Sequence, residues 1–333
     1  MTRRTHGSRV WLVLAAAALV VAGRALPAQA VAQACEAPLA SQDACQKAAD
    51  LFAFMAPQLG TAIAGGNPTL GQGGNLGRFG SVSFGVRLTG MRGELPRPEP
   101  VGARLGAAQP STFPVSDQWF ALPQMDVDIG ITRGVPLGVS NVGGIDLLVS
   151  GSWLPEVEER DVSLRATGGS FRIGYGARLG ILQETQSTPG VSITYLRRAL
   201  PNADIEARSG DDTLQVLAAR VRADSWRLVA SRHLAAFGVA AGIGQDRIDS
   251  RAAVEAIVNE GPTRVTMGTP RPFSQRLTRQ SAFANLSLNV WIVRLVGEVG
   301  RTWGGSATTF NGFAGTSATT PRLYGSVGLR AGL

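Results

Sequence analysis

Residues 171–182, FRIGYGARLGIL, alternate between two kinds of side chain, and this alternation most constrains what the chain can fold into. One parity is apolar or aromatic, and the other consists of glycine and arginine. Successive side chains of a β-strand point to opposite faces, so a period of two predicts a strand with one apolar and one polar face. Two environments fit such a strand: a soluble sheet packed on a core, or a barrel with lipid outside and a polar interior.

The same alternation returns in about ten segments between residue 79 and the last residue, Leu333. Long connections alternate with short ones. The long connections are 95–117, 155–168, 199–212, 249–279 and 304–320, and the short ones are 134–144, 183–190, 233–236 and the turn at Trp291. Up-and-down hairpins would place all long connections at one end and all short ones at the other. Between Val221 and Trp226 the apolar parity changes, which indicates a bulge or a strand that projects beyond the membrane.

The sequence therefore predicts an all-β fold with a short N-terminal helix. We expect an antiparallel up-and-down transmembrane β-barrel of about ten strands, with about eight to twelve possible. A secreted soluble β-sandwich that binds a ligand explains the alternation equally well, but it does not explain the loop asymmetry. Lipid permits no open sheet edge, so in a barrel the first and last strands must pair, which gives the terminal strand a structural role.

The N-terminus predicts export from the cytoplasm. Arg3 and Arg4 precede an apolar run at 10–22 and then Ala28-Gln29-Ala30, which is the order of a secretory signal. The run is shorter than the ~20 residues of a membrane-spanning helix. We expect a signal peptide, an N-terminal periplasmic or plug segment, and a transmembrane barrel, at residues 1–30, 31–75 and 76–333.

Two cysteines, Cys35 and Cys45, follow the signal. Disulfides persist in exported proteins, so we predict a bridge between them. In the alternative interpretation, Ala32-Gln33-Ala34-Cys35 is a lipidation site and Cys35 becomes the modified N-terminus.

A short helix is predicted from Asp43 towards Pro57. We expect it to pack on the barrel end or lie at the membrane surface, and the alternative is a plug inside the barrel. The glycine-rich residues 65–74 that follow are predicted to be a tether with no fixed conformation.

If the apolar parity faces lipid, charged side chains line the interior. The predicted lumen-lining residues are Arg87, Asp126, Asp128, Arg172, Arg178, Arg294, Glu298 and Arg330. Unpaired charges in a narrow interior are costly, so Asp126 and Asp128 should pair with Arg172 or Arg178. Such a network can fill the interior and fix the strand register, or it can line a polar path or a weak ligand site. Ten strands enclose little more than eight, whose side chains already fill the interior, so we do not expect an open pore.

Nothing in the sequence predicts an enzyme, a cofactor or a metal site. The expected mature chain has one histidine, His233, at a predicted periplasmic turn, and we find no zinc set, phosphate loop or nucleophile elbow. The formal charge of +8 is spread along the chain, so nucleic acid is not an expected partner.

Over residues 79–333, this pattern resembles that of bacterial outer-membrane β-barrel proteins. The terminal strand is similar to that family's assembly signal, although it ends in Leu333 where Phe or Trp is commoner. The resemblance implies the bacterial outer membrane as location, with its lipid and the barrel-assembly machinery as partners. Residues 60–74, with Asn67-Pro68-Thr69, resemble the N-terminal hatch of the long-chain fatty-acid transporter family.

Two functions follow as expectations. The first is an occluded channel for small solutes or lipophilic molecules. The alternative is a structural or surface-interaction protein of the outer membrane without transport activity.

Overall fold

One helix and many strands make up the described part of the chain. The computed structural model describes residues 41–98, 101, 104–159, 162–209, 212–259, 265–267 and 271–332. The predicted signal peptide and Cys35 lie outside the described residues. The elements are α2 (Gln42–Ala64), β1 (Val82–Pro96), β2 (Thr112–Phe113), β3 (Val115–Thr132), β4 (Val135–Leu137), β5 (Ser140–Val142), β6 (Gly144–Trp153), β7 (Val157–Glu159), β8 (Val162–Ala166), β9 (Phe171–Leu182), β10 (Gly190–Ala199), β11 (Ala203–Ser209), β12 (Asp212–Leu234), β13 (Phe237–Asn259), β14 (Val265–Met267), β15 (Arg271–Val290), β16 (Val293–Trp303), β17 (Gly312–Phe313) and β18 (Arg322–Gly332). No helix in these ranges is both long enough and apolar enough to span a membrane.

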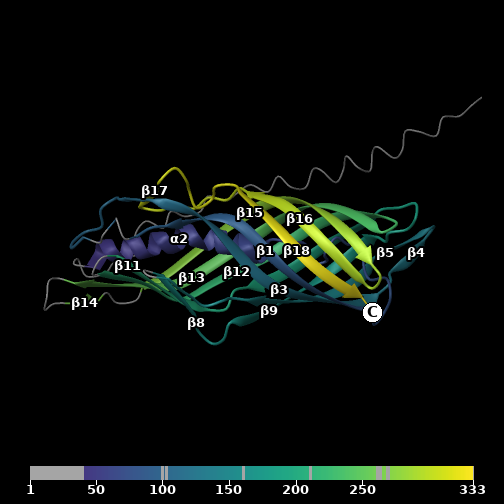
Figure 1. The fold of residues 1–333 in the computed structure, drawn as a ribbon, viewed down its shortest axis with the longest axis horizontal. Helices are drawn as coiled ribbons and strands as arrows, with labels where there is room; N and C mark the ends of the chain where they lie inside the picture. The colour runs from purple at the N-terminus through teal and green to yellow at the C-terminus, as the bar shows by residue number, and fades with distance from the viewer. Residues whose placement is uncertain are drawn as a thin grey trace, which may run out of the picture.

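The large sheet closes on itself into an antiparallel ring of about ten strands (Figure 1). Around the ring the order is β13, β15, β16, β18, β1, β3, β6, β9, β10 and β12, and β12 pairs again with β13. The first and last strands of the ring, β1 and β18, pair from Ser83 with Gly332 to Met91 with Tyr324. The predicted all-β antiparallel fold is confirmed, and the ring differs from the two facing sheets of a sandwich.

The strands of the ring differ in length, and the longest of them project at one of its two ends. Figure 1 shows α2, β11, β14 and β17 at one end, which we call the loop end, and the C-terminus with β4 and β5 at the other, the turn end. β12 and β13 have 23 residues each, so much of the predicted loops 199–212 and 249–279 is strand. Similarly, β7 and β8 lie within the predicted loop 155–168, and β1 continues to Pro96.

The two faces of β12 exchange their polarity half-way along the strand, which explains why the sequence predicts a loop where the structure has a strand. Near the turn end, Arg227 is buried inside the ring and Leu228 points outward. Near the loop end, Val221 is buried inside the ring and Arg222 points outward. The loop-end half therefore has the polarity of a water-soluble protein, which is why its alternation could be mistaken for a polar loop. A separate bulge lies at Ala218, where the register with β13 shifts and φ is 49°.

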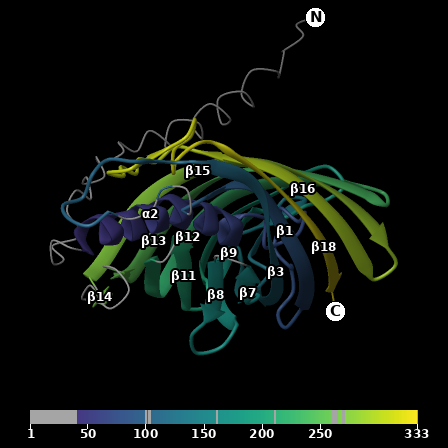
Figure 2. The same cartoon turned by 60° about the vertical axis from the view of Figure 1, so that its left-hand side comes forward.

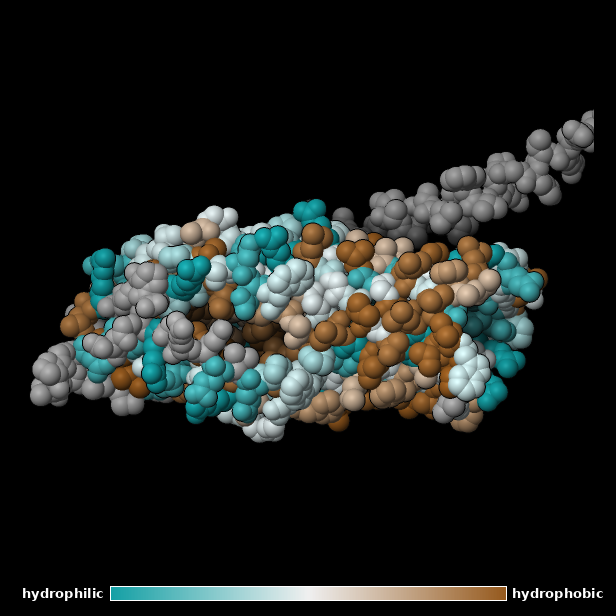
Figure 3. Space-filling model, viewed as in Figure 1, coloured by the Kyte–Doolittle hydropathy of each residue, from teal (hydrophilic) through white to brown (hydrophobic). Residues whose placement is uncertain are grey.

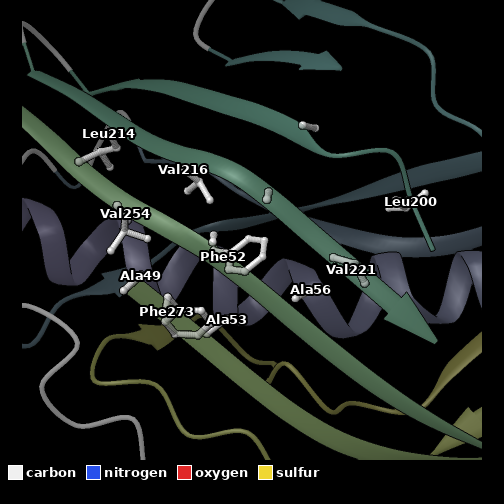
Figure 4. Packing of buried hydrophobic residues seen from close by; sticks show 14 of the residues in the cluster. Ala49, Phe52, Ala53, Ala56, Leu200, Leu214, Val216, Val221, Val254 and Phe273 are labelled. Atoms are coloured by element: carbon white, nitrogen blue, oxygen red, sulfur yellow. The ribbon is translucent and has the colours of Figure 1, made fainter. Parts of the chain in front are cut away.

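Helix α2 lies within the loop end of the ring, as the turned view in Figure 2 shows, and it contacts six ring strands: β1, β3, β10, β12, β13 and β15. Its apolar side chains form one core with inward residues of the long strands β12, β13 and β15 (Figure 4). Phe52 meets the ring of Phe273 edge-on, with the centroids 5.5 Å apart. The helix was predicted to run towards Pro57, but it continues to Ala64 with Pro57 inside it. Burial among the strands outweighs the backbone hydrogen bond that a proline removes.

A cap covers α2 at the loop end. Phe54 stacks on Phe313 with 4.0 Å between ring centroids, and Phe313 stacks on Phe113. The backbone N–H and the side-chain amide of Asn311 both donate to the carboxylate of Asp50 on α2, at 2.8 and 2.7 Å. The helix is thereby attached to the connection after β16 as well as to the wall.

Candidate functional site: the apolar belt and the filled interior

An apolar belt surrounds the turn-end half of the ring. In Figure 3 hydrophobic side chains gather over this half of the molecule. Its large exposed members include Phe84, Val86, Leu88, Met125, Leu147, Val149, Ile173, Leu179, Val239, Ile243, Leu286, Leu295, Val327 and Leu329. At about 3.3 Å per residue and a tilt of about 40°, the stretch from Phe171 to Ile181 rises about 25 Å, the height of the apolar band of an outer-membrane barrel.

Exposed aromatic side chains mark both edges of this belt. Trp153 and Trp226 lie at its loop-end edge, and Phe237 and Trp291 lie at its turn-end edge. Trp226 packs against Tyr195, with 4.8 Å between the ring centroids. Aromatic girdles at two levels are typical of a band that sits between two lipid–water interfaces.

The interior of the same half holds most of the charges named from the sequence. Six of the eight residues are buried: Arg87, Asp126, Asp128, Arg178, Glu298 and Arg330. The Nε atom of Arg87 lies 3.2 Å from Asp126, and Nη2 of Arg330 lies 2.6 Å from Asp128. Nη2 of Arg178 is 3.9 Å from Asp128 but 2.6 Å from Asp146, which faces it on β6.

The other two predicted residues lie elsewhere. Arg172 is exposed and contacts neither Asp126 nor Asp128, because it is the second residue of β9, where the wall meets the loop end. Arg294 is half-buried near the turn end, and its Nε donates to Asn289 at 2.7 Å.

Sequence reasoning missed two arginines that cap the end of α2. Arg198 donates to the carbonyl of Ile63 at 3.1 Å, and Arg227 donates to the carbonyl of Ala64 at 2.9 Å. The last carbonyls of a helix lack partners and carry partial negative charge, so two guanidinium groups stabilise this helix end inside the ring. Their own carboxylates are Asp126 at 3.4 Å and Asp246 at 2.7 Å. The signal was available for Arg227, because it alternates with the outward Trp226 and Leu228.

The glycine-rich residues 65–76, which we call the interior segment, lead from α2 to the turn end through the ring. Side chains of the wall bind their backbone along the way. The N–H of Asn67 donates to Glu298 at 2.9 Å, that of Gly73 donates to Ser231 at 2.8 Å, and that of Leu76 donates to Asp146 at 3.1 Å. Arg330 donates to the carbonyl of Thr69. The prediction of a tether without fixed conformation is wrong, because the polar wall satisfies this backbone.

Glycines let the segment and the wall approach closely. A Cβ atom on Gly73 would lie 2.6 Å from the carbonyl oxygen of Gly190 and from the backbone nitrogen of Ser231. In the wall, Leu70 occupies the space next to Gly85 and Gly328, where an added Cβ would lie 2.8 Å from its methyl groups. These glycines therefore shape the interior to receive the segment.

The segment ends at a group of side chains that we call the turn-end clasp: Gln183, Glu184, Ser231 and His233. The amide of Gln183 accepts from Asn75 N–H at 3.1 Å and donates to its carbonyl at 3.2 Å. Glu184 accepts from Ser231 at 2.8 Å and contacts the Nδ1 atom of His233 at 2.9 Å. An open pocket of about 340 Å³ lies beside the clasp. The clasp joins the segment, β12 and the connection between β9 and β10.

Two further predictions concern cysteines and metals. Cys45 is buried in α2, and no cysteine is free among the residues that the structure describes. Its predicted partner, Cys35, is outside those residues, so the bridge stays a prediction. Within the described ranges no group of three His, Cys, Asp or Glu side chains could hold a metal ion.

Comparisons with known proteins show little. No protein-family model and no curated protein sequence matches the chain. Among solved structures, a "TodX deltaS2S3 mutant monoaromatic hydrocarbon channel" is 10% identical over 82% of this chain and 97% of its own, with a TM-score of 0.28. An outer-membrane expressed OmpT of Vibrio cholerae is 8% identical, with coverages of 77% and 99% and a TM-score of 0.14. A bacterial polysaccharide outer membrane secretin is also 8% identical, with coverages of 75% and 98% and a TM-score of 0.20. Likenesses this weak carry no argument about fold or function.

Proposed function

We propose that the chain is a bacterial outer-membrane β-barrel that acts as a channel for small solutes or lipophilic molecules and is closed at rest. The apolar belt with its aromatic edges supports the membrane location, because it surrounds only the half of the ring whose interior is polar. The observation that carries the channel function is the interior segment, which fills this polar half and is held by hydrogen bonds.

A closure made of hydrogen bonds can be reversed in water. Each such bond contributes only about 0.5–1.5 kcal/mol net, because water replaces it when the groups separate. The core around α2 is apolar, so its exposure would cost far more. We therefore expect the segment to move while α2 stays, leaving a path lined by paired charges such as Arg178 with Asp146.

A disulfide that holds the segment to the wall tests the channel. The Cβ of a residue at position 71 would lie 3.5 Å from Cβ of Ser287, within the range of a disulfide. Conductance of the Gly71→Cys/Ser287→Cys variant is measured in planar bilayers. We expect openings in the wild type, loss of openings in the oxidised variant and recovery with reductant.

The single variant Gly71→Cys receives the same treatment. It controls for the strain of a side chain at φ 78° and for effects of reductant on the native cysteines. Absence of both conductance and solute uptake in the wild type would reject the channel.

The second candidate is an outer-membrane protein without transport activity, acting through its loop end. The cap over α2 favours it, because the stack of Phe54, Phe113 and Phe313 closes that end with apolar contacts. A folded membrane protein that never conducts would support this function.

The membrane location has its own test, which both candidates share. The protein should fractionate with outer membranes, and its electrophoretic mobility should change on heating, as expected of a closed barrel in detergent. A protein that stays soluble without detergent would contradict the location.

We also propose that the barrel-assembly machinery recognises β18.

A further inference from the structure

One buried arginine differs from all the others in the described ranges. The buried arginines are Arg87, Arg178, Arg198, Arg227, Arg279, Arg322 and Arg330. Six of them have a carboxylate oxygen within 4.0 Å, and Arg279 has none from any residue that the structure describes. Arg279 is also fully buried, at 0% exposure. A lone charge away from water is costly, so this guanidinium needs a counter-ion.

The described residues around Arg279 offer it backbone carbonyls but no free carboxylate. Its Nη2 atom donates to the carbonyl of Thr320 at 3.0 Å, and its Nε and Nη1 atoms have no partner in the described part of the chain. The residue opposite it on β13 is Asp246, but an oxygen of Asp246 lies 2.7 Å from Nη2 of Arg227. One carboxylate thus stands between two arginines, and one positive charge is left over.

Three further donors lie beside Arg279 on the inner wall. Ser281, Thr302 and Arg322 are register partners across β15, β16 and β18, and all three are buried. The hydroxyls of Ser281 and Thr302 and the Nε atom of Arg322 have no partner among the described residues. Nη2 of Arg322 is 2.6 Å from Glu94, so this group holds two guanidiniums and one carboxylate.

We propose that a small oxyanion binds between Arg279, Arg322, Ser281 and Thr302. Phosphate, sulfate and the carboxylate of an organic acid share the required chemistry, because each presents several oxygens that accept hydrogen bonds from charged and neutral donors. Arg279 contacts the carbonyls of Thr319 and Thr320, which lie in the connection between β16 and β18, so we expect the anion to enter past this connection. The proposal does not rest on conduction, since a permanently closed barrel would hold the anion equally well.

Calorimetric titration of the detergent-solubilised protein tests the site. Phosphate, sulfate and acetate are titrated separately in a buffer without other oxyanions. We expect one anion to bind per chain, with at least tenfold weaker binding in Arg279→Met. The control is Arg301→Met, which removes an exposed, outward arginine from β16 and should leave the affinity unchanged. Tighter binding of phosphate or sulfate identifies an inorganic anion, and tighter binding of acetate identifies a carboxylate. Absence of binding in the wild type, or equal binding in Arg279→Met, would overturn the proposal.

Thermal unfolding without oxyanion separates loss of binding from loss of folding. Arg279→Met removes a lone charge and leaves no carboxylate unpaired, so its midpoint should be equal to or above that of the wild type. Arg178→Met leaves Asp146 without its closest partner, so its midpoint should fall. A clear decrease for Arg279→Met in this buffer would show that a carboxylate of the protein already neutralises Arg279, and it would also overturn the proposal.

Discussion

Among single residues, Ser231 connects the interior segment directly to the turn-end clasp. Its hydroxyl accepts from Gly73 N–H and donates to Glu184. Ser231→Ala leaves a buried N–H without an acceptor, at a cost of about 1–3 kcal/mol. We expect amide exchange of residues 70–76 to accelerate about tenfold or more, as measured by mass spectrometry. Ser192→Ala is the matched control, because Ser192 is buried on the inner face of β10 and its hydroxyl has no partner in the described ranges. Equal acceleration in both variants would contradict this role.

Glu184 makes the contact between Ser231 and the interior segment dependent on pH. Burial raises the pKa of Glu184, but hydrogen bonds from Ser231 and His233 outweigh this and hold the pKa below its ordinary value. A carboxylate with a lowered folded-state pKa contributes stability that is complete above the unfolded value of about 4.3 and is lost as the pH falls through the folded-state value. We expect exchange of residues 70–76 to accelerate in that acidic range, and Glu184→Gln to remove this dependence. Glu158→Gln, at an exposed position, should retain it.

Within single strands, polarity changes face at the level where the belt ends. On β13 the outward residues are apolar from Phe237 to Ile243, and beyond the belt they include Arg247 and Arg251. The inward residues change in the opposite sense, from glycine and aspartate to Ile248 and other apolar residues of the core around α2. The sequence predicts the turn-end part of such strands well, since apolar and polar residues alternate regularly along it. For the loop-end part, the sequence instead predicts loops, because the apolar face of that part packs on α2, whose position no local pattern reveals.

Two alanines on the outer face of β13 test this change of environment. Ala241 lies in the belt, and Ala253 lies beyond it on the same face. Ala241→Arg should lower the free energy of unfolding in lipid bilayers by about 2–4 kcal/mol if it lies near the midplane, whereas Ala253→Arg faces water and should change it by less than about 1 kcal/mol. Denaturant titration in vesicles measures both. Similar costs at the two sites would contradict the assignment of the belt.

For the whole molecule, the ring could be predicted from the sequence, but its contents could not. Alternation and loop lengths gave the all-β antiparallel ring of about ten strands, because strand pairing is a local and repeated pattern. The pairing of Arg178 with Asp146 was missed, since choosing among inward carboxylates requires the register of β6 and β9. The path of residues 65–76 was missed for a different reason: glycine adopts whatever conformation the surrounding side chains impose.

In the proposed membrane location, one half of the ring lies in lipid and the other in water, and we expect the two halves to unfold separately. Phe52 is buried in the core between α2 and the long strands β12, β13 and β15. Phe52→Ala should therefore lower the free energy of unfolding of the loop-end half by about 3–5 kcal/mol. The other half has a separate cluster of buried apolar residues, and in the proposed membrane location lipid surrounds it. We expect limited proteolysis in vesicles to cut Phe52→Ala at the loop end while the heat-dependent mobility of the barrel is retained. Phe79→Ala, at a side chain that is 79% exposed, is the control and should change neither property. Loss of both properties together in Phe52→Ala would show that the two halves unfold as one unit.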